Sequence, residues 1–113
     1  MNAMDGNALA LTVLTTTDDE GKAHTLATGA VEARLAACAQ IAGPVTSVYR
    51  WQGNTETAQE WQVLLKTTAD GYEALESWLL EAHDYDTPEI IATPVVRGSA
   101  GYLAWIAGET GGA

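Results

Sequence analysis

The chain has 113 residues, 47% of them apolar, which is enough for one small domain with its own core. Fifteen Asp and Glu against five Lys and Arg give a formal net charge of −10. Such a surface repels phosphate groups, so nucleic acid and anionic membranes are excluded as partners. One cysteine, Cys38, allows no internal disulfide, and the first seven residues show no leader pattern. These features predict a cytoplasmic protein.

The first half of the chain predicts a strand, a helix and a second strand. Residues 1–7 are expected to form a disordered tail, and residues 8–16 are rich in Leu, Val and Thr, which is typical of a buried strand. The acidic run 18–20 opens a helix, because acids in the first turn face the positive end of the helix dipole. Residues 38–51 alternate between apolar and polar, so every second residue from Ala39 to Trp51 is predicted to share one face.

A hairpin turn and a second helix follow. Gly53-Asn54 predicts a two-residue turn, after which residues 55–68 form the returning strand. Asp70 and Glu73 have the spacing of a capping box, which predicts the start of a helix at this point.

The last part of the chain predicts a loop over 83–89, a strand over 90–96 and a short helix that begins after Gly98-Ser99. The glycine-rich residues 108–113 are expected to form a disordered tail.

This order of elements indicates a single α+β domain over residues 1–113. It is the ferredoxin-like split βαβ sandwich, here with a long hairpin and an additional C-terminal helix. In that topology the second and fourth strands lie at the edges of the sheet. Those two strands contain Pro44 and Pro94, and an edge strand tolerates the missing N–H of proline.

The predicted hairpin is too long for the domain. Each arm, 38–51 and 55–68, would extend about 46 Å at about 3.3 Å per residue, whereas a compact chain of this size is roughly 35 Å across. The overhanging part is apolar, and exposed aromatic residues on an unpaired arm favour aggregation unless a partner covers them. We therefore expect a homo-oligomer; the alternative is a single exposed tryptophan. The predicted interface residues are Tyr49, Trp51, Trp61 and Trp105.

Few side chains of this sequence are suited to a copper or zinc ion. Cys38, His24 and His83 are present without the spacing of a metal motif, and Cys38 and His24 are as well explained as a buried apolar group and a solvated residue. His83 lies on a loop with several acids. We take His83, Cys38 and Glu89 as metal candidates, with a divalent metal such as copper as an optional cofactor.

A second set of polar residues predicts a cleft between subunits. Glu60 and Lys66 share a face of the returning strand, and a charge that is half-buried there needs a partner. An ion pair with Arg50 or Glu89 that fixes the assembly is one explanation. The other is a ligand-binding cleft formed by Glu60, Lys66, Arg50 and Tyr85.

The sequence does not predict an enzyme. It has no nucleophile elbow and no glycine-rich phosphate loop, and His83 has no Ser or Cys nucleophile in an evident relation to it.

Five segments in a fixed order resemble the CutA divalent-cation tolerance family. They span about residues 9–106 and are RLAAC at 34–38, GP at 43–44, SVYRWQG at 47–53, Glu60 with LKTT at 65–68, and HDYDTPEII at 83–91, with Tyr102 and Trp105 near the end. The resemblance implies a homotrimer of ferredoxin-like subunits whose long hairpins pack on neighbouring subunits. It also implies a role in tolerance to copper and other divalent metals, without an established reaction. The trimer of that family is similar to that of PII-type regulators, which bind small molecules between subunits, and this gives the alternative function.

The resemblance also implies where copper ligands would lie. In family members with assigned ligands, they are a Cys at the end of the first strand and two adjacent His residues. The matching positions here are Thr15, Ala82 and His83, and Asp84 stands where a proline is usual. We therefore expect a copper site of that kind to be incomplete in this chain.

Overall fold

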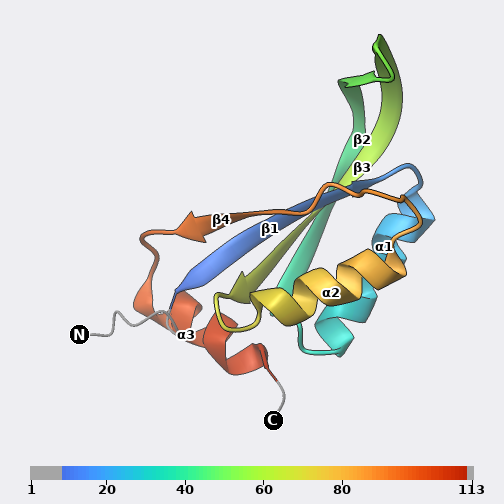
Figure 1. Cartoon of the computed structure of the whole chain (residues 1–113). Coiled ribbons are helices and arrows are strands. Elements are labelled where there is room, and N and C mark those ends of the chain that lie inside the picture. The colour runs from blue at the N-terminus through green and yellow to red at the C-terminus, as the bar shows by residue number, and fades with distance from the viewer. Residues whose placement is uncertain (1–8, 112–113) are drawn as a thin grey trace.

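The computed structural model describes residues 9–111 and shows a four-stranded antiparallel sheet with three helices (Figure 1). Along the chain the elements are β1 (Ala10–Thr17), α1 (Glu20–Glu32), β2 (Cys38–Trp51), β3 (Asn54–Thr68), α2 (Tyr72–Ala82), β4 (Ile91–Val95) and α3 (Ala100–Glu109). The strand order is β2-β3-β1-β4, so the predicted ferredoxin-like topology is confirmed. The proline-containing strands β2 and β4 lie at the two edges, also as predicted. None of the helices within residues 9–111 has the length and apolar character needed to cross a bilayer.

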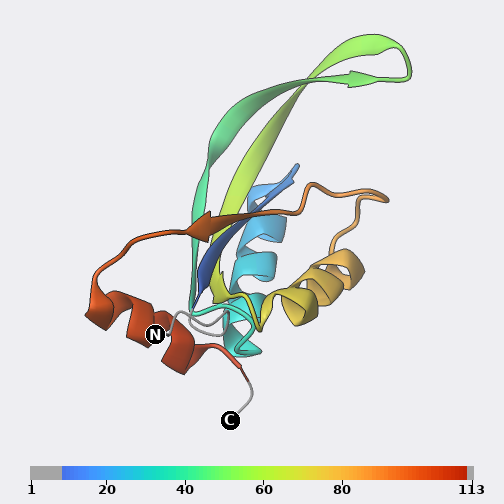
Figure 2. The same cartoon turned by 60° about the vertical axis from the view of Figure 1, so that its left-hand side comes forward.

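One face of the sheet carries the core, and α1 and α2 cover it (Figures 1 and 2). The odd-numbered residues of β1 and β3 point to this face, which is why Val13, Val63 and Leu65 are buried there. Leu75 and Leu79 of α2 pack on them and are fully buried. Burial of such side chains contributes about 1.5–3 kcal/mol each, so this single layer supplies most of the stability of the domain.

Helix α1 begins and ends with side-chain contacts. The Asp19 side chain accepts a hydrogen bond from the backbone N–H of Lys22, so the predicted acidic start of the helix is confirmed. Beyond its other end, the Arg34 guanidinium donates to the carbonyls of Gly108 and Gly111. These bonds hold the end of the chain, and the predicted disordered tail is therefore wrong for residues 108–111; residues 1–7 and 112–113 lie outside the described residues.

Two local predictions are displaced by one residue. The hairpin turn is Gln52-Gly53, with Trp51 paired to Asn54, because both turn residues have positive φ as a tight two-residue turn requires. Helix α2 has Gly71 as its N-cap residue, one position after the predicted N-cap Asp70.

An irregularity in β2 reverses the face of its second half. Pairing passes from Ala42–Gln62 to Val45–Glu60, so Gly43 and Pro44 together lie opposite the single residue Trp61. Beyond this bulge the odd residues of β2 pair with even residues of β3, which point away from the core. The prediction that Ala39 and Trp51 share one face is therefore wrong.

The hairpin extends far beyond the helices, as Figure 2 shows. The molecule measures 49 × 25 × 22 Å, and its long axis follows β2 and β3. At the far end Val48, Tyr49 and Trp51 are 67%, 45% and 60% exposed. The predicted overhang of an apolar tip is confirmed.

Helix α3 packs at the opposite end of the molecule from the hairpin tip (Figure 1). Ile106 is buried against Ala10 and Ala37, with Val95 and Leu103 packed beside them. This second small core covers only one end of the sheet face that α1 and α2 leave open.

We predict that Gly29→Ala lowers the free energy of unfolding by about 1 kcal/mol. A Cβ atom at Gly29 would lie 2.7 Å from Cζ2 of Trp78, so the two helices must separate. Overpacking of this kind costs about 1–3 kcal/mol, and the higher helix propensity of alanine offsets about 1 kcal/mol of it. Chemical denaturation measures the difference. Gly101→Ala is the control, because nothing lies within 4 Å of its added Cβ, and it should leave the stability unchanged or raise it slightly.

Candidate functional site

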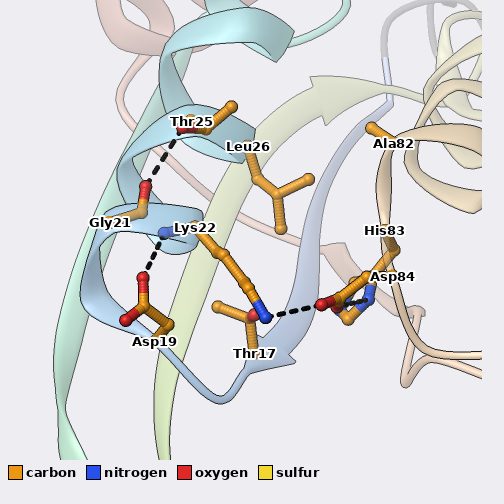
Figure 3. Close-up of a pocket in the computed structure, with 9 residues that line it drawn as sticks. All are labelled: Thr17, Asp19, Gly21, Lys22, Thr25, Leu26, Ala82, His83 and Asp84. Atoms are coloured by element: carbon orange, nitrogen blue, oxygen red, sulfur yellow. Dashed lines mark hydrogen bonds and ion pairs between the residues drawn. The ribbon is translucent and has the colours of Figure 1, made fainter.

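A cleft opens where the N-terminal end of α1 meets the loop after α2 (Figure 3). Its volume is about 460 Å³. The end of β1 forms its floor, because Thr17 is the last residue of that strand and lines the cavity. The lining residues are Thr17, Asp19, Gly21, Lys22, Thr25, Leu26, Ala82, His83 and Asp84.

His83 fastens the loop to the sheet. Its side chain has no exposed surface, and Nε2 lies 2.7 Å from the carbonyl oxygen of Thr16. Nδ1 accepts a hydrogen bond from the backbone N–H of Tyr85 at 3.1 Å. Since Nδ1 accepts, the ring is the tautomer that carries its proton on Nε2 and donates it to Thr16. Both ring nitrogens are therefore in use.

These contacts do not fit the copper site that the family resemblance implies. A metal ligand needs a free nitrogen lone pair, and the one lone pair of His83 accepts from Tyr85. The hydroxyl of Thr15, which stands at the position of the family's cysteine, is a weaker ligand for copper than a thiolate. Within residues 9–111, no three His, Cys, Asp or Glu side chains come together as a metal site.

The three predicted metal candidates lie apart in one subunit. Cys38 is paired across the sheet with Lys66, which is opposite Thr12 of β1, whereas His83 contacts Thr16. Four residues along β1 correspond to about 13 Å. Glu89 is exposed near the end of the loop before β4. Cys38 and His24 instead line a second hollow of about 440 Å³ between α1 and β2.

Lys22 spans the mouth of the cleft (Figure 3). Its ammonium group donates to Asp84 Oδ2 at 2.5 Å and to Asp18 Oδ1 at 3.0 Å. The hydrogen bond to Asp84, and then that to Asp18, raises the pKa of Lys22 above its ordinary range. In return the hydrogen bond from Lys22 lowers the pKa of Asp84. The lysine thus joins α1 to the loop after α2 by charge, next to the hydrogen bonds of His83.

The four residues of the predicted intersubunit cleft do not meet in one subunit. Tyr85 donates its hydroxyl proton to Glu60 at 2.8 Å, and burial together with this bond raises the pKa of Tyr85. Lys66 lies near the other end of β3 and donates to Gln40 and to the Tyr102 hydroxyl. Arg50 lies at the hairpin tip.

The Arg50 guanidinium donates to the carbonyl of Gly53, so its charge stays at the tip of the hairpin. The sequence predicted an ion pair that joins Glu60 or Lys66 to Arg50 or Glu89. No such pair is present among the described residues.

The predicted interface residues fall in three places. Tyr49 and Trp51 are exposed on the hairpin, and Trp105 is exposed on α3, where its ring centroid lies 5.4 Å from that of Tyr102. Trp61 is half-buried at the edge of the core, next to the bulge.

Lys22, Asp84 and Thr17 were not predicted as a group from the sequence. Asp18 and Lys22 have i,i+4 spacing, a local signal for one of the two ion pairs. The second pair joins residues 62 positions apart, and only the packing of α1 beside α2 brings them together.

Fold and site together define a ferredoxin-like α+β protein with a polar cleft at the end of its first strand and a hairpin that reaches beyond its own core. A model of the family described as "CutA1 divalent ion tolerance protein" matches residues 11–109. The chain belongs to this family.

Individual relatives agree in both sequence and structure. The divalent-cation tolerance protein CutA of Thermus thermophilus is 42% identical over 99 residues, which cover 88% of this chain and 96% of the relative. The Escherichia coli protein of the same name is 38% identical over 106 residues, 94% and 95% of the two chains. The solved structure from Thermus thermophilus has a TM-score of 0.88 at 41% identity, over 90% of this chain and 99% of that one. CutA1 from Oryza sativa has a TM-score of 0.89 at 31% identity, over 93% and 96%.

We predict that His83→Ala lowers the free energy of unfolding by at least about 2 kcal/mol. The substitution leaves the Thr16 carbonyl and the Tyr85 N–H without partners. Each buried polar group that loses its partner costs about 1–3 kcal/mol of stability. His83→Gln keeps a donor for Thr16 and should lose less. Thermal and chemical denaturation measure both. A copper titration of His83→Gln should match that of the wild type, and a tenfold loss of affinity would return His83 to the list of metal ligands.

We predict that the wild type and Asp84→Asn differ in stability at neutral pH and converge in acid. Lys22 holds the pKa of Asp84 below its ordinary value of 3.8, so the unfolded state binds this proton more readily than the folded state. The stabilisation is therefore present above pH 3.8 and is lost as the pH falls through the lower folded pKa. Unfolding curves measured at a series of pH values from neutral pH into the acid range below pH 3.8 measure the difference. Asp86→Asn, an exposed change in the same loop, should run parallel to the wild type throughout.

Proposed function

We propose that this chain acts in tolerance to divalent cations as a homotrimer, by binding and not by catalysis. The names of its relatives support the first part, since these are divalent-cation tolerance proteins. The observation that carries the assembly is the apolar surface that the three helices leave open on the sheet and at the hairpin tip.

This open face begins on the sheet. Leu14 and Leu64 lie opposite one another on the side away from α1 and α2, and Ile91 beside Leu14 is 54% exposed. Because the bulge reverses β2, Tyr49 and Trp51 point to the same side of the ribbon. The side that the helices leave open therefore carries apolar residues both at the middle of the sheet and at the hairpin tip, with Glu60 and Glu56 between them.

A second copy of the chain is the partner that this face favours. An exposed apolar area of this extent marks an interaction surface, and closed symmetric homo-oligomers are the commonest arrangement. A neighbouring subunit can place its own sheet under the overhanging hairpin. Three copies are what the family resemblance implies.

The proposed cation binding is weak and electrostatic. With a net charge of −10 the surface attracts cations, but His83 is engaged and Cys38 lies far from it. A binding role in tolerance then needs no built copper site and no obligatory cofactor.

The PII-like alternative is not favoured. It requires Lys66, Arg50 and His83 to face one anionic ligand, and each is occupied in a different part of the subunit. The relatives named here are divalent-cation tolerance proteins and not nitrogen regulators.

Two other predictions, the absence of enzymatic activity and the cytoplasmic location, stay predictions. The absence of enzymatic activity is consistent with the family name, and a cytoplasmic location is our proposal, although the Archaeoglobus fulgidus relative, 30% identical, is described as periplasmic.

The wild type should be a trimer at micromolar concentration, and the double variant Tyr49→Asp/Trp51→Asp should shift to monomers. The two added carboxylates would be desolvated without partners in the assembly, which is costly. Light scattering coupled to size-exclusion chromatography measures the mass. The control is Thr55→Asp/Thr57→Asp, which adds the same charge at exposed polar positions of the same hairpin and should stay trimeric.

The same variants test the role in tolerance. In a strain without its own family member, the wild type and the control should restore growth in copper, and the monomeric variant should not. A wild type that is a folded monomer, or that gives no growth advantage, would refute the corresponding half of the proposal.

A further inference from the structure

Two carboxylates converge on one point at the mouth of the cleft, and the ammonium group of Lys22 occupies that point. Asp84 Oδ2 lies 2.5 Å and Asp18 Oδ1 lies 3.0 Å from Nζ, so the oxygens are at most the sum of these distances, about 5.5 Å, apart. Two oxygens on opposite sides of one Ca²⁺ ion lie roughly 5 Å apart. The carboxylates are thus almost at the spacing of cation ligands while they hold a lysine.

A buried hydroxyl group lines the same cavity. Thr17 is 1% exposed, and its Oγ1 has no hydrogen-bond partner within the described residues. Such a group is normally satisfied by protein, water or an ion. Thr17 and Lys22 both face this cavity, as Figure 3 shows.

The loop that carries Asp84 is fixed independently of Lys22. His83 ties the loop to Thr16, and Tyr85 ties it to Glu60. If Lys22 withdrew, Asp84 would therefore stay close to Asp18. The carboxylates would then be left unneutralised and preorganised for another cation.

We propose that Asp18 and Asp84, with the Thr17 hydroxyl, form a binding site for a hard divalent cation such as Ca²⁺ or Mn²⁺, and that Lys22 is its tethered competitor. When divalent cations are scarce, the ammonium group fills the site. When they are abundant, an ion with twice the charge displaces it. This inference rests on the proposed role in divalent-cation tolerance and names a site at which the cation would act.

The donor set decides which ions fit. All ligands are oxygens, which Ca²⁺, Mg²⁺ and Mn²⁺ accept, whereas copper and zinc prefer nitrogen and sulfur. Two carboxylates are few, and water must complete the coordination. With the lysine in competition, we expect dissociation constants on the order of 10⁻³ M, as in weak extracellular calcium modules.

Displacement of Lys22 has a structural consequence. The lysine is a charged link between α1 and the loop after α2. An ion that bridges Asp18 and Asp84 would keep the two elements joined and release the Lys22 side chain into solvent. The cleft would then carry an unpaired Lys22 ammonium group beside the bound metal ion, where it now carries an ion pair between Lys22 and the two aspartates.

The test is a titration of the full chain with Mn²⁺, in which electron paramagnetic resonance measures the concentration of free Mn²⁺ at each step. Lys22→Met removes the competitor and should bind Mn²⁺ at least about tenfold more tightly than the wild type, since a unit charge at contact distance is removed. The double variant Lys22→Met/Asp84→Asn should return to wild-type affinity or below.

Arg97→Met is the matched control, because it changes the net charge by the same amount at an exposed residue away from the cleft. Its affinity for Mn²⁺ should lie within about twofold of that of the wild type, which is the change expected from the net charge of the protein alone. Equal affinities of Lys22→Met and Arg97→Met would overturn the proposal. So would tight binding by Lys22→Met/Asp84→Asn.

Light scattering and circular dichroism on every variant separate this inference from the proposed function. A folded, trimeric Lys22→Met that restores growth in copper but gains no Mn²⁺ affinity would refute only the cation site. Failure of the wild type itself to assemble or to restore growth would refute the proposed function, whatever the titration gives.

Discussion

The length of the hairpin is the constraint on which the rest of this molecule depends. β2 and β3 continue past the point where α1 and α2 can cover them, so the far part of each strand has a partner strand but no core. A two-stranded ribbon without a packed face is at best marginally stable in water. Tyr49 and Trp51 at its end add exposed aromatic surface, which favours a partner that buries it. The ribbon is therefore the part of the fold for which we propose that a second copy of the chain supplies the missing cover.

The bulge at Gly43 and Pro44 decides which side of the ribbon needs that cover. By placing two residues opposite Trp61, it transfers the odd positions of β2 from the core face to the open face. Without it, Tyr49 and Trp51 would continue the face that α1 and α2 cover. With it, they lie on the same side as the open sheet surface around Leu14 and Leu64.

At the other functional region, polar contacts take the place of a metal. Histidine, lysine and two aspartates are gathered where the family resemblance suggests copper, but the imidazole holds the loop and the lysine neutralises the acids. The site that we propose here is therefore one for hard cations and not for soft ones. In the proposed site, and in a chain with a net charge of −10, the tethered lysine would limit the binding of cations at ordinary concentrations.

The sequence by itself determined the element order, the edge positions of the two proline strands and the overhang of the hairpin. Each of these follows from local periodicity or from counting residues, which need no knowledge of packing. It did not determine the strand register across Gly43-Pro44, the anchoring of the chain end by Arg34 or the meeting of Lys22 with Asp84. A bulge breaks the alternation on which face prediction rests, and contacts such as those of Arg34 and Lys22 join residues more than 60 positions apart. Only the tertiary structure decides these features. It pairs β2 with β3 and packs α1 against its neighbours.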